Sequence, residues 1–206
     1  ILDKNNGQTL YKTILSTNTW CKTNIKYYKE YRINLYLRGT KIITHDFDLK
    51  NKNVFIQLDS HSIGDTLAWF PYIDEFRKKH ECKVYCSTFW NSWFINQYSE
   101  LTFIEPGENL NIELYAKYNI GWYNPIDTNR NPNDYKKIPL QKTASDILGL
   151  EYKEIIPKIE IPDGIRPIKE KYVCIAQFST ANTKHWHYPC KDSNIGWQIL
   201  VDWLND

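Results

Sequence analysis

A strand followed by a polar turn and a helix is the feature of this sequence that most restricts its fold. Residues 53–58 read NVFIQL, an apolar run with the length and composition of a buried β-strand. Apolar residues then recur at helical spacing through residues 67–76, and this pattern ends in the basic run 77–80. Such a strand–turn–helix module is the building block of α/β domains. We therefore expect an α/β fold.

The turn of this module carries one acid, Asp65, directly after Gly64. In α/β domains, ligands bind at the carboxyl ends of the strands, where such turns lie. A carboxylate fixed there can act as a general base when a substrate proton comes within hydrogen-bonding reach. Aspartate is also a favoured N-cap residue, so the alternative is that Asp65 only caps the helix. The residues of the turn leave both roles open.

The segments around this module predict a β-rich part followed by an alternating part. Residues 1–50 form a small β extension, with a hairpin that turns at Arg38-Gly39 and a further strand around 23–28. In residues 51–162, strand-like and helix-like segments alternate, which favours a parallel, doubly wound, Rossmann-like domain. The segments that we expect are 53–58, 67–80, 83–87, 91–98, 101–105, 114–122 and 140–150.

A proline-punctuated linker then precedes a second region, residues 163–206. It begins with a predicted strand at 172–178 and continues with a helix from Gly196 to the end, the start of an incomplete second Rossmann-like domain. Because the chain lacks an initial Met and stops within a helical pattern, we expect a piece of a longer protein.

The polar segment after the strand at 172–178 contains groups that suit a phosphate. The hydroxyls of Ser179 and Thr180, the loop amides and the ammonium of Lys184 can all contact phosphate oxygens. No glycine-rich fingerprint supports a dinucleotide or P-loop site here. The alternative is a polar strand end with a solvated lysine.

Composition narrows the partners and the compartment. The formal net charge of +2 gives no sign of a nucleic-acid surface, and no apolar run reaches membrane-spanning length. Five cysteines without a CxxC pair indicate free thiols in a reducing cytoplasm. His185, His187 and Cys190 have the spacing of part of a zinc site, but a fourth ligand is missing, so we predict no metal.

Two motifs resemble those of the family 9 glycosyltransferases, the heptosyltransferases. Residues 62–65, SIGD, with Pro71 six residues later, resemble the N-terminal GD motif of that family. Residues 179–186, STANTKHW, resemble the phosphate-binding turn that opens its second domain. Longer runs resemble the autotransporter O-heptosyltransferases over nearly the whole chain, extension included: STNTWC, GDTLAWFPYIDEFRKKH, CSTFWN and PLQKTASDILGLEYKEI.

This resemblance implies a two-domain type B glycosyltransferase, with residues 51–162 on the acceptor side and the region from 163 binding the donor. It implies inverting transfer of heptose from an ADP-activated donor to a protein serine. Asp65 would be the general base. Ser179, Thr180 and Lys184 would hold the diphosphate, and Ser62 and Gly64 would shape the pocket.

The resemblance also implies partners. These are the ADP-sugar, an autotransporter-like acceptor protein and, in a homo-oligomer, further copies of the chain, with no nucleic acid and no membrane span. The iron-binding cysteine cluster of the subfamily would lie beyond residue 206, and residues 1–206 alone would be inactive. The alternatives are a related transferase that acts on a saccharide, and a non-catalytic nucleotide-sugar-binding or adaptor protein.

Overall fold

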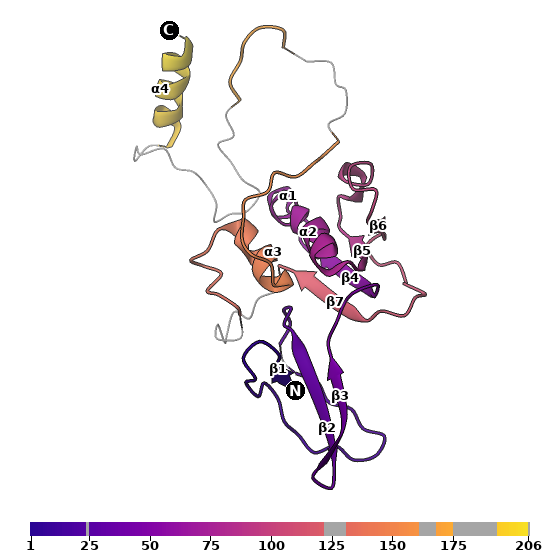
Figure 1. The fold of residues 1–206 in the computed structure, drawn as a ribbon. Coiled ribbons are helices and arrows are strands. Elements are labelled where there is room, and N and C mark those ends of the chain that lie inside the picture. Colours follow the sequence, from indigo (N-terminus) through magenta and orange to yellow (C-terminus); the bar gives the residue numbers. More distant parts are fainter. Residues whose placement is uncertain (24, 122–130, 161–167, 175–192, 206) are drawn as a thin grey trace. The chain divides into compact units, whose positions relative to one another are not determined.

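The computed structural model describes residues 1–23, 25–121, 131–160, 168–174 and 193–205. The chain separates into two compact units, Ile1–Ile161 and Pro162–Asp206 (Figure 1). The second unit contains helix α4 (Ser193–Asn205), which confirms the helix predicted from Gly196. Residues 172–174 form no strand, so the prediction of a strand at 172–178 is wrong for this part. The rest of that segment lies outside the described residues.

A four-stranded parallel sheet forms the centre of the first unit. Its strands lie in the order β6 (Thr102–Phe103), β5 (Lys83–Ser87), β4 (Asn53–Leu58) and β7 (Ala116–Ile120). All three strand pairs are parallel, with Val54 of β4 opposite Val84 of β5 and Ala116 of β7. The predicted α/β class with a parallel sheet is therefore confirmed.

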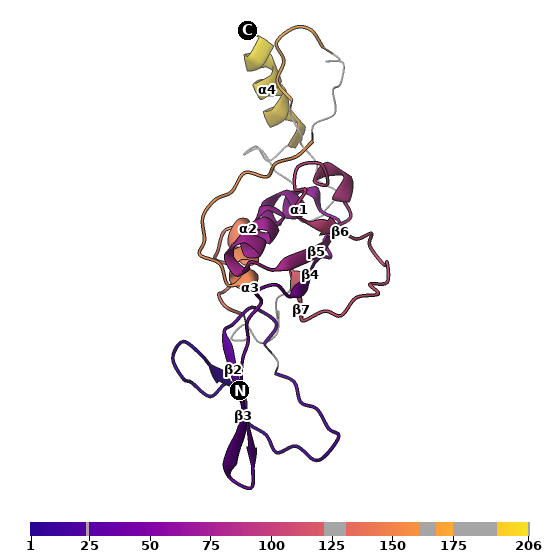
Figure 2. The ribbon, with the colours of Figure 1, turned by 45° about the vertical axis from the view of Figure 1, so that its right-hand side comes forward.

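Three helices cover one face of this sheet, as Figures 1 and 2 show. They are α1 (Ile63–Trp69), α2 (Pro71–His80) and α3 (Leu140–Leu148). The sequence predicts one helix where α1 and α2 stand, and the difference arises at Pro71. Proline has no N–H to donate and occupies the first turn of a helix, so α2 begins there.

The core lies between these helices and the sheet. Val54, Ile56 and Leu58 of β4 alternate towards it and are at most 1% exposed. Phe70, at the junction of α1 and α2, is fully buried and stacks on Phe94 with ring centroids 3.9 Å apart. Two outer elements are shorter than predicted: a single 3₁₀ turn η1 (Asn91–Trp93) replaces the helix at 91–98, and β6 has two residues.

The N-terminal extension forms an antiparallel sheet of β1 (Leu2–Asp3), β2 (Tyr31–Leu37) and β3 (Thr40–Asp46). The hairpin of β2 and β3 turns at Arg38 and Gly39, with φ of 50° and 84°, which confirms the predicted turn. Paired positive φ values match the right-handed twist of hairpin strands.

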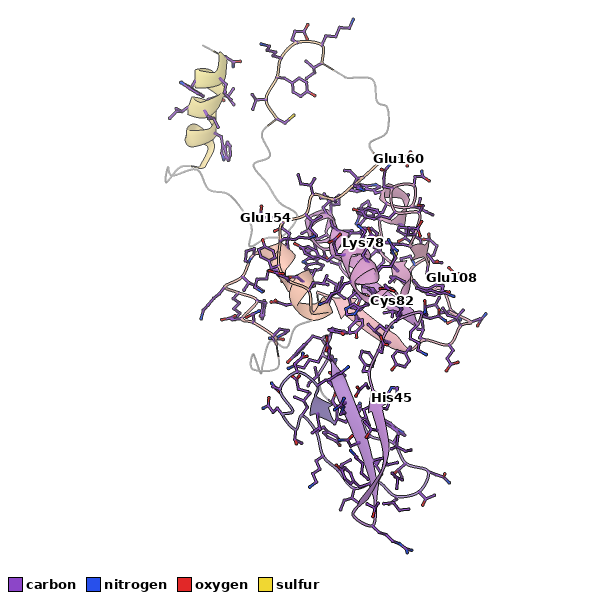
Figure 3. All side chains as sticks on the ribbon, viewed as in Figure 1. His45, Lys78, Cys82, Glu108, Glu154 and Glu160 are labelled. Atoms are coloured by element: carbon purple, nitrogen blue, oxygen red, sulfur yellow. The ribbon has the colours of Figure 1, made fainter. Side chains whose placement is uncertain are left out.

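Polar contacts of His45 and Tyr28 are among those that join the extension to the α/β part within the first unit. Imidazole Nε2 of His45, labelled in Figure 3, lies 2.9 Å from the hydroxyl of Tyr115. The backbone N–H of Tyr28 donates to the carbonyl of Ile147 in α3 at 2.8 Å. The strand predicted around residues 23–28 is therefore wrong for the described residues of that segment, because Tyr28 bonds to the end of a helix rather than to a neighbouring strand.

Candidate active site

The order of the strands places a ligand-binding position beside the end of β4. From β4 the chain continues to β5 and β6 on one side, and then crosses to β7 on the other. The direction of winding therefore changes between β4 and β7. In open α/β sheets, ligands bind outside the carboxyl ends of the strands at such a switch point. The turn 59–62 leaves β4 there and leads into α1.

Ser62 is the N-cap of α1. Its hydroxyl oxygen accepts from the backbone N–H of Asp65 at 3.5 Å, and its carbonyl accepts from the hydroxyl of Thr66 at 3.1 Å. Asp65 lies three residues after the cap, in the first turn of the helix. The alternative in which Asp65 is the capping residue is therefore wrong, because Ser62 fills that position.

The carboxylate of Asp65 is half-buried and is held by Ser60. The hydroxyl of Ser60 donates to Asp65 Oδ2 at 2.6 Å, and the same hydroxyl oxygen accepts from the N–H of Ser62 at 3.1 Å. Among the described residues, no hydrogen bond joins Asp65 Oδ1. The turn thus orients the carboxylate through Oδ2 and leaves Oδ1 without a hydrogen bond from the described residues.

Within the described part of the chain, neither the backbone conformation nor a close contact requires glycine at position 64. Its φ is not positive, and a Cβ atom placed on it would meet only Ser62 Oγ, at 3.9 Å. The lack of a side chain at Gly64 lets a ligand come close to the backbone. The fold itself would accept a larger residue at this position. The pocket-shaping roles of Ser62 and Gly64 stay predictions.

Asp59 is a second carboxylate at this edge that the sequence analysis missed. It follows β4 directly and accepts hydrogen bonds from the side-chain amides of Gln57 and Asn119. These two residues are opposite each other in β4 and β7, so Asp59 is attached to both strands at the switch point. Its position one residue after a buried strand was the signal that could have found it.

Aromatic side chains brace the same turn from the end of β5. The imidazole of His61 stacks on Phe89, with centroids 3.5 Å apart and planes at 20°. The indole N–H of Trp90 donates to the carbonyl of His61 at 3.3 Å. Phe89 keeps 42% of its surface exposed, so the stack presents an apolar edge to solvent near the turn. No local pattern predicts this contact, because it joins residues far apart in the chain.

The predicted phosphate-binding residues lie outside the described residues. This applies to Ser179, Thr180 and Lys184, and to His185, His187 and Cys190 of the zinc alternative. Their roles stay predictions.

The described cysteines do not form a metal-binding set. Cys82 and Cys86 are buried in the core, where burial raises the pKa of Cys82 to about 11 and raises the pKa of Cys86 further. Cys21 and Cys174 are also free thiols. No group of three metal-ligating side chains occurs in the described ranges. None of the helices in the described part is long and apolar enough to cross a bilayer.

Known proteins with similar sequences are autotransporter heptosyltransferases. Aah of Escherichia coli is 32% identical over 212 residues, which cover all of this chain and 52% of Aah. TibC of Escherichia coli O78:H11 is 30% identical, over 88% of this chain and 44% of TibC. BimC of Burkholderia thailandensis, an inactive autotransporter heptosyltransferase, is 29% identical over 87% of this chain and 42% of BimC. No protein-family model matches the chain.

Solved structures of TibC match the fold as well. The crystal structure of TibC from enterotoxigenic E. coli H10407, a dodecameric iron-containing glycosyltransferase, has a TM-score of 0.86 and 28% identity over 99% of this chain and 52% of that one. TibC in complex with ADP-D-β-D-heptose has a TM-score of 0.84. This chain thus spans about half the length of these relatives. Over that half, in sequence and in fold, it is a homologue of the autotransporter heptosyltransferases.

Proposed function

We propose that this chain supplies the acceptor side of an inverting heptosyltransferase, which moves heptose from an ADP-activated donor to a serine hydroxyl of a protein. The observation that carries the proposal is the oriented carboxylate of Asp65 at the switch point of the sheet. It occurs in a chain whose homologues are heptosyltransferases, one of which has been crystallised with ADP-heptose.

In the proposed reaction, Asp65 takes the proton of the acceptor serine as its oxygen attacks the anomeric carbon of the heptose. The new bond joins that oxygen to the anomeric carbon, and the bond from this carbon to the β-phosphate oxygen breaks. Ser179, Thr180 and Lys184 hold the departing diphosphate and offset its charge. Ser62 and Gly64 shape the pocket around the attacking group. This two-domain arrangement is the type B arrangement of glycosyltransferases.

Two further properties belong to the proposal. A cytoplasmic location fits the free thiols of the described cysteines, which persist in a reducing compartment. A homo-oligomer is proposed because TibC is dodecameric, and light scattering on the full-length protein measures it. TibC is also iron-containing, but the described residues of this chain do not fit an iron site, so no step involves iron.

The substitution Asp65→Asn in the full-length protein tests the base. It keeps the size of the side chain and an oxygen that can accept from Ser60, but it removes the proton acceptor. Transfer from ADP-heptose should fall by roughly 10²–10⁴-fold, while donor binding and the melting temperature stay close to those of the unmodified protein.

Asp74→Asn is the matched control. Asp74 also lies in the first turn of a helix, but its carboxylate pairs with Arg77 at 2.9 Å and Lys78 at 2.8 Å. Asp74→Asn should lower the melting temperature and leave transfer unchanged at permissive temperature. Near-normal transfer by Asp65→Asn would remove Asp65 from the catalytic role.

A second candidate, a non-catalytic binder of ADP-sugars, is favoured by one observation: BimC, at a similar level of identity, is inactive. Calorimetry separates the two. Binding of ADP-heptose by the full-length protein without transfer to any acceptor supports the binder. Transfer to a lipid-linked saccharide but not to a protein supports a saccharide acceptor instead.

A further inference from the structure

We propose that Ser60 is a positioning residue for the Asp65 base, a role that deepens the proposed function and rests on it. Ser60 lies between the end of β4 and the cap of α1 and is half-buried. Its side chain contacts the carboxylate on which the transfer reaction would depend. Neither the GD motif nor the phosphate-binding turn includes this residue.

The direction of the hydrogen bond between Ser60 and Asp65 follows from its partners. The backbone N–H of Ser62 can only donate, so the hydroxyl oxygen of Ser60 accepts there, at 3.1 Å. A serine hydroxyl has a single proton. That proton is therefore available for Asp65 Oδ2, 2.6 Å away. The hydroxyl acts as a bridge between the cap of the helix and the carboxylate.

The sheet in turn fixes the position of Ser60. The preceding residue, Asp59, accepts hydrogen bonds from Gln57 of β4 and Asn119 of β7. The turn is thus attached to two adjacent parallel strands on one side and to α1 on the other. A carboxylate supported in this way keeps one orientation relative to the switch point, which is the geometry that efficient proton transfer requires.

One consequence follows for the reaction. Loss of the Ser60 hydroxyl frees the carboxylate of Asp65 to rotate, which lowers the rate of the chemical step. Binding of the donor does not depend on this hydroxyl, so kcat should change while KM for the donor does not.

Several charged groups near α1 form ion pairs with residues other than Asp65. On α3, Lys142 pairs with Asp146 at 2.6 Å, and on α2, Asp74 pairs with Arg77 and Lys78. The remaining titratable groups of the turn and of the packed elements are Asp59, His61, Glu75, Lys79 and His80. No hydrogen bond or ion pair between any of these groups and Asp65 occurs within the described part of the chain.

The experiment compares Ser60→Ala, Ser60→Thr and the control Ser99→Ala in the full-length protein. Ser99 is an exposed serine of the same unit. The measurements are kcat for transfer from ADP-D-β-D-heptose to a purified autotransporter acceptor, KM for the donor and the melting temperature.

Ser60→Ala should lower kcat by roughly 10-fold or more, with little change in KM for the donor. Ser60→Thr, which keeps a hydroxyl, should restore most of the rate. Ser99→Ala should match the unmodified protein.

A lower melting temperature in Ser60→Ala with an unchanged kcat at permissive temperature, or a Ser60→Thr protein as slow as Ser60→Ala, would show a structural role only and overturn the proposal. An Asp65→Asn protein with normal transfer would overturn the proposed function together with this inference. An inactive Asp65→Asn protein, combined with an unchanged rate in Ser60→Ala, would overturn the role of Ser60 alone.

Discussion

The ring of Tyr28 lies directly over Gly149. A Cβ atom built on Gly149 would overlap the edge of this ring and lie 3.1 Å from its Cγ. Gly149 ends α3 in the left-handed conformation, with φ of 62°, and Tyr28 belongs to the N-terminal extension. The same ring contacts Phe76 and His80 of α2 and Tyr118 of β7. Tyr28 is therefore one of the side chains through which the extension packs on the α/β part.

Gly149→Ala should destabilise the protein by roughly 2–4 kcal/mol, from the strain of a left-handed alanine and from overlap with the ring. The measurement is the shift of the thermal unfolding midpoint. Gly7→Ala is the matched control, because Gly7 also has a positive φ, 72°, but no atom lies within 4 Å of its added Cβ. Equal costs for the two substitutions would contradict the close contact between Tyr28 and Gly149.

We expect the folded protein to lose stability in mild acid because of the imidazole of His80. Burial between the rings of Tyr28 and Phe76, with a smaller effect of the Lys79 charge, lowers the pKa of His80 from 6.5 to about 4. Asp48 opposes this shift. The Nε2 atom of His80 is buried and has no hydrogen-bond partner in the described part of the chain. The folded protein therefore keeps this ring neutral where the unfolded chain protonates it.

The folded pKa of His80 is below the unfolded one, so the unfolded state binds more protons between pH 6.5 and about 4. Stability should fall as the pH drops through this window, by about 1–2 kcal/mol once the partial exposure of the ring is considered. Urea unfolding of the unmodified protein and of His80→Leu at a series of pH values measures the effect. The variant should show a shallower dependence in this window, and an identical slope would refute the assignment.

A substitution of Lys184 tests its predicted role in binding the donor. Its ammonium suits a diphosphate as a point charge. In the full-length protein, Lys184→Ala should weaken binding of ADP-heptose and slow transfer, at a combined cost of about 2–4 kcal/mol. Calorimetry and initial rates measure the two effects. Donor affinity and rate equal to those of the unmodified protein would show that Lys184 does not bind the donor.

Residues 1–206 by themselves should show no transfer of heptose. The chain spans about half of Aah, and a type B site needs groups from two domains. The measurement is incorporation of labelled heptose into an autotransporter acceptor, with the full-length protein as the positive control. Turnover by residues 1–206 at a rate near that of the full-length protein would mean that the proposed division of the site is wrong.

The sequence by itself determined the elements whose signal is local. The apolar run of β4, the spacing of apolar residues in α3 and its end at Gly149 each arise from neighbouring residues, and each element formed where the pattern predicts it. The position of Asp65 between a predicted strand and a predicted helix likewise indicated the candidate site before any contact was known. The resemblance to the autotransporter heptosyltransferases was also present in the residue order alone, and the relatives confirm it.

The tertiary structure decided what depends on residues distant in the chain. The carboxylate of Asp59 accepts a hydrogen bond from Asn119, which lies sixty residues away. Tyr28 packs on α3 and α2 instead of forming the predicted strand. The identity of the N-cap of α1 also required geometry, because both Ser62 and Asp65 are residue types that can cap a helix, and only the hydrogen bonds show that Ser62 does so. Local patterns reflect backbone preference and burial, whereas these contacts depend on how the strands are ordered in space.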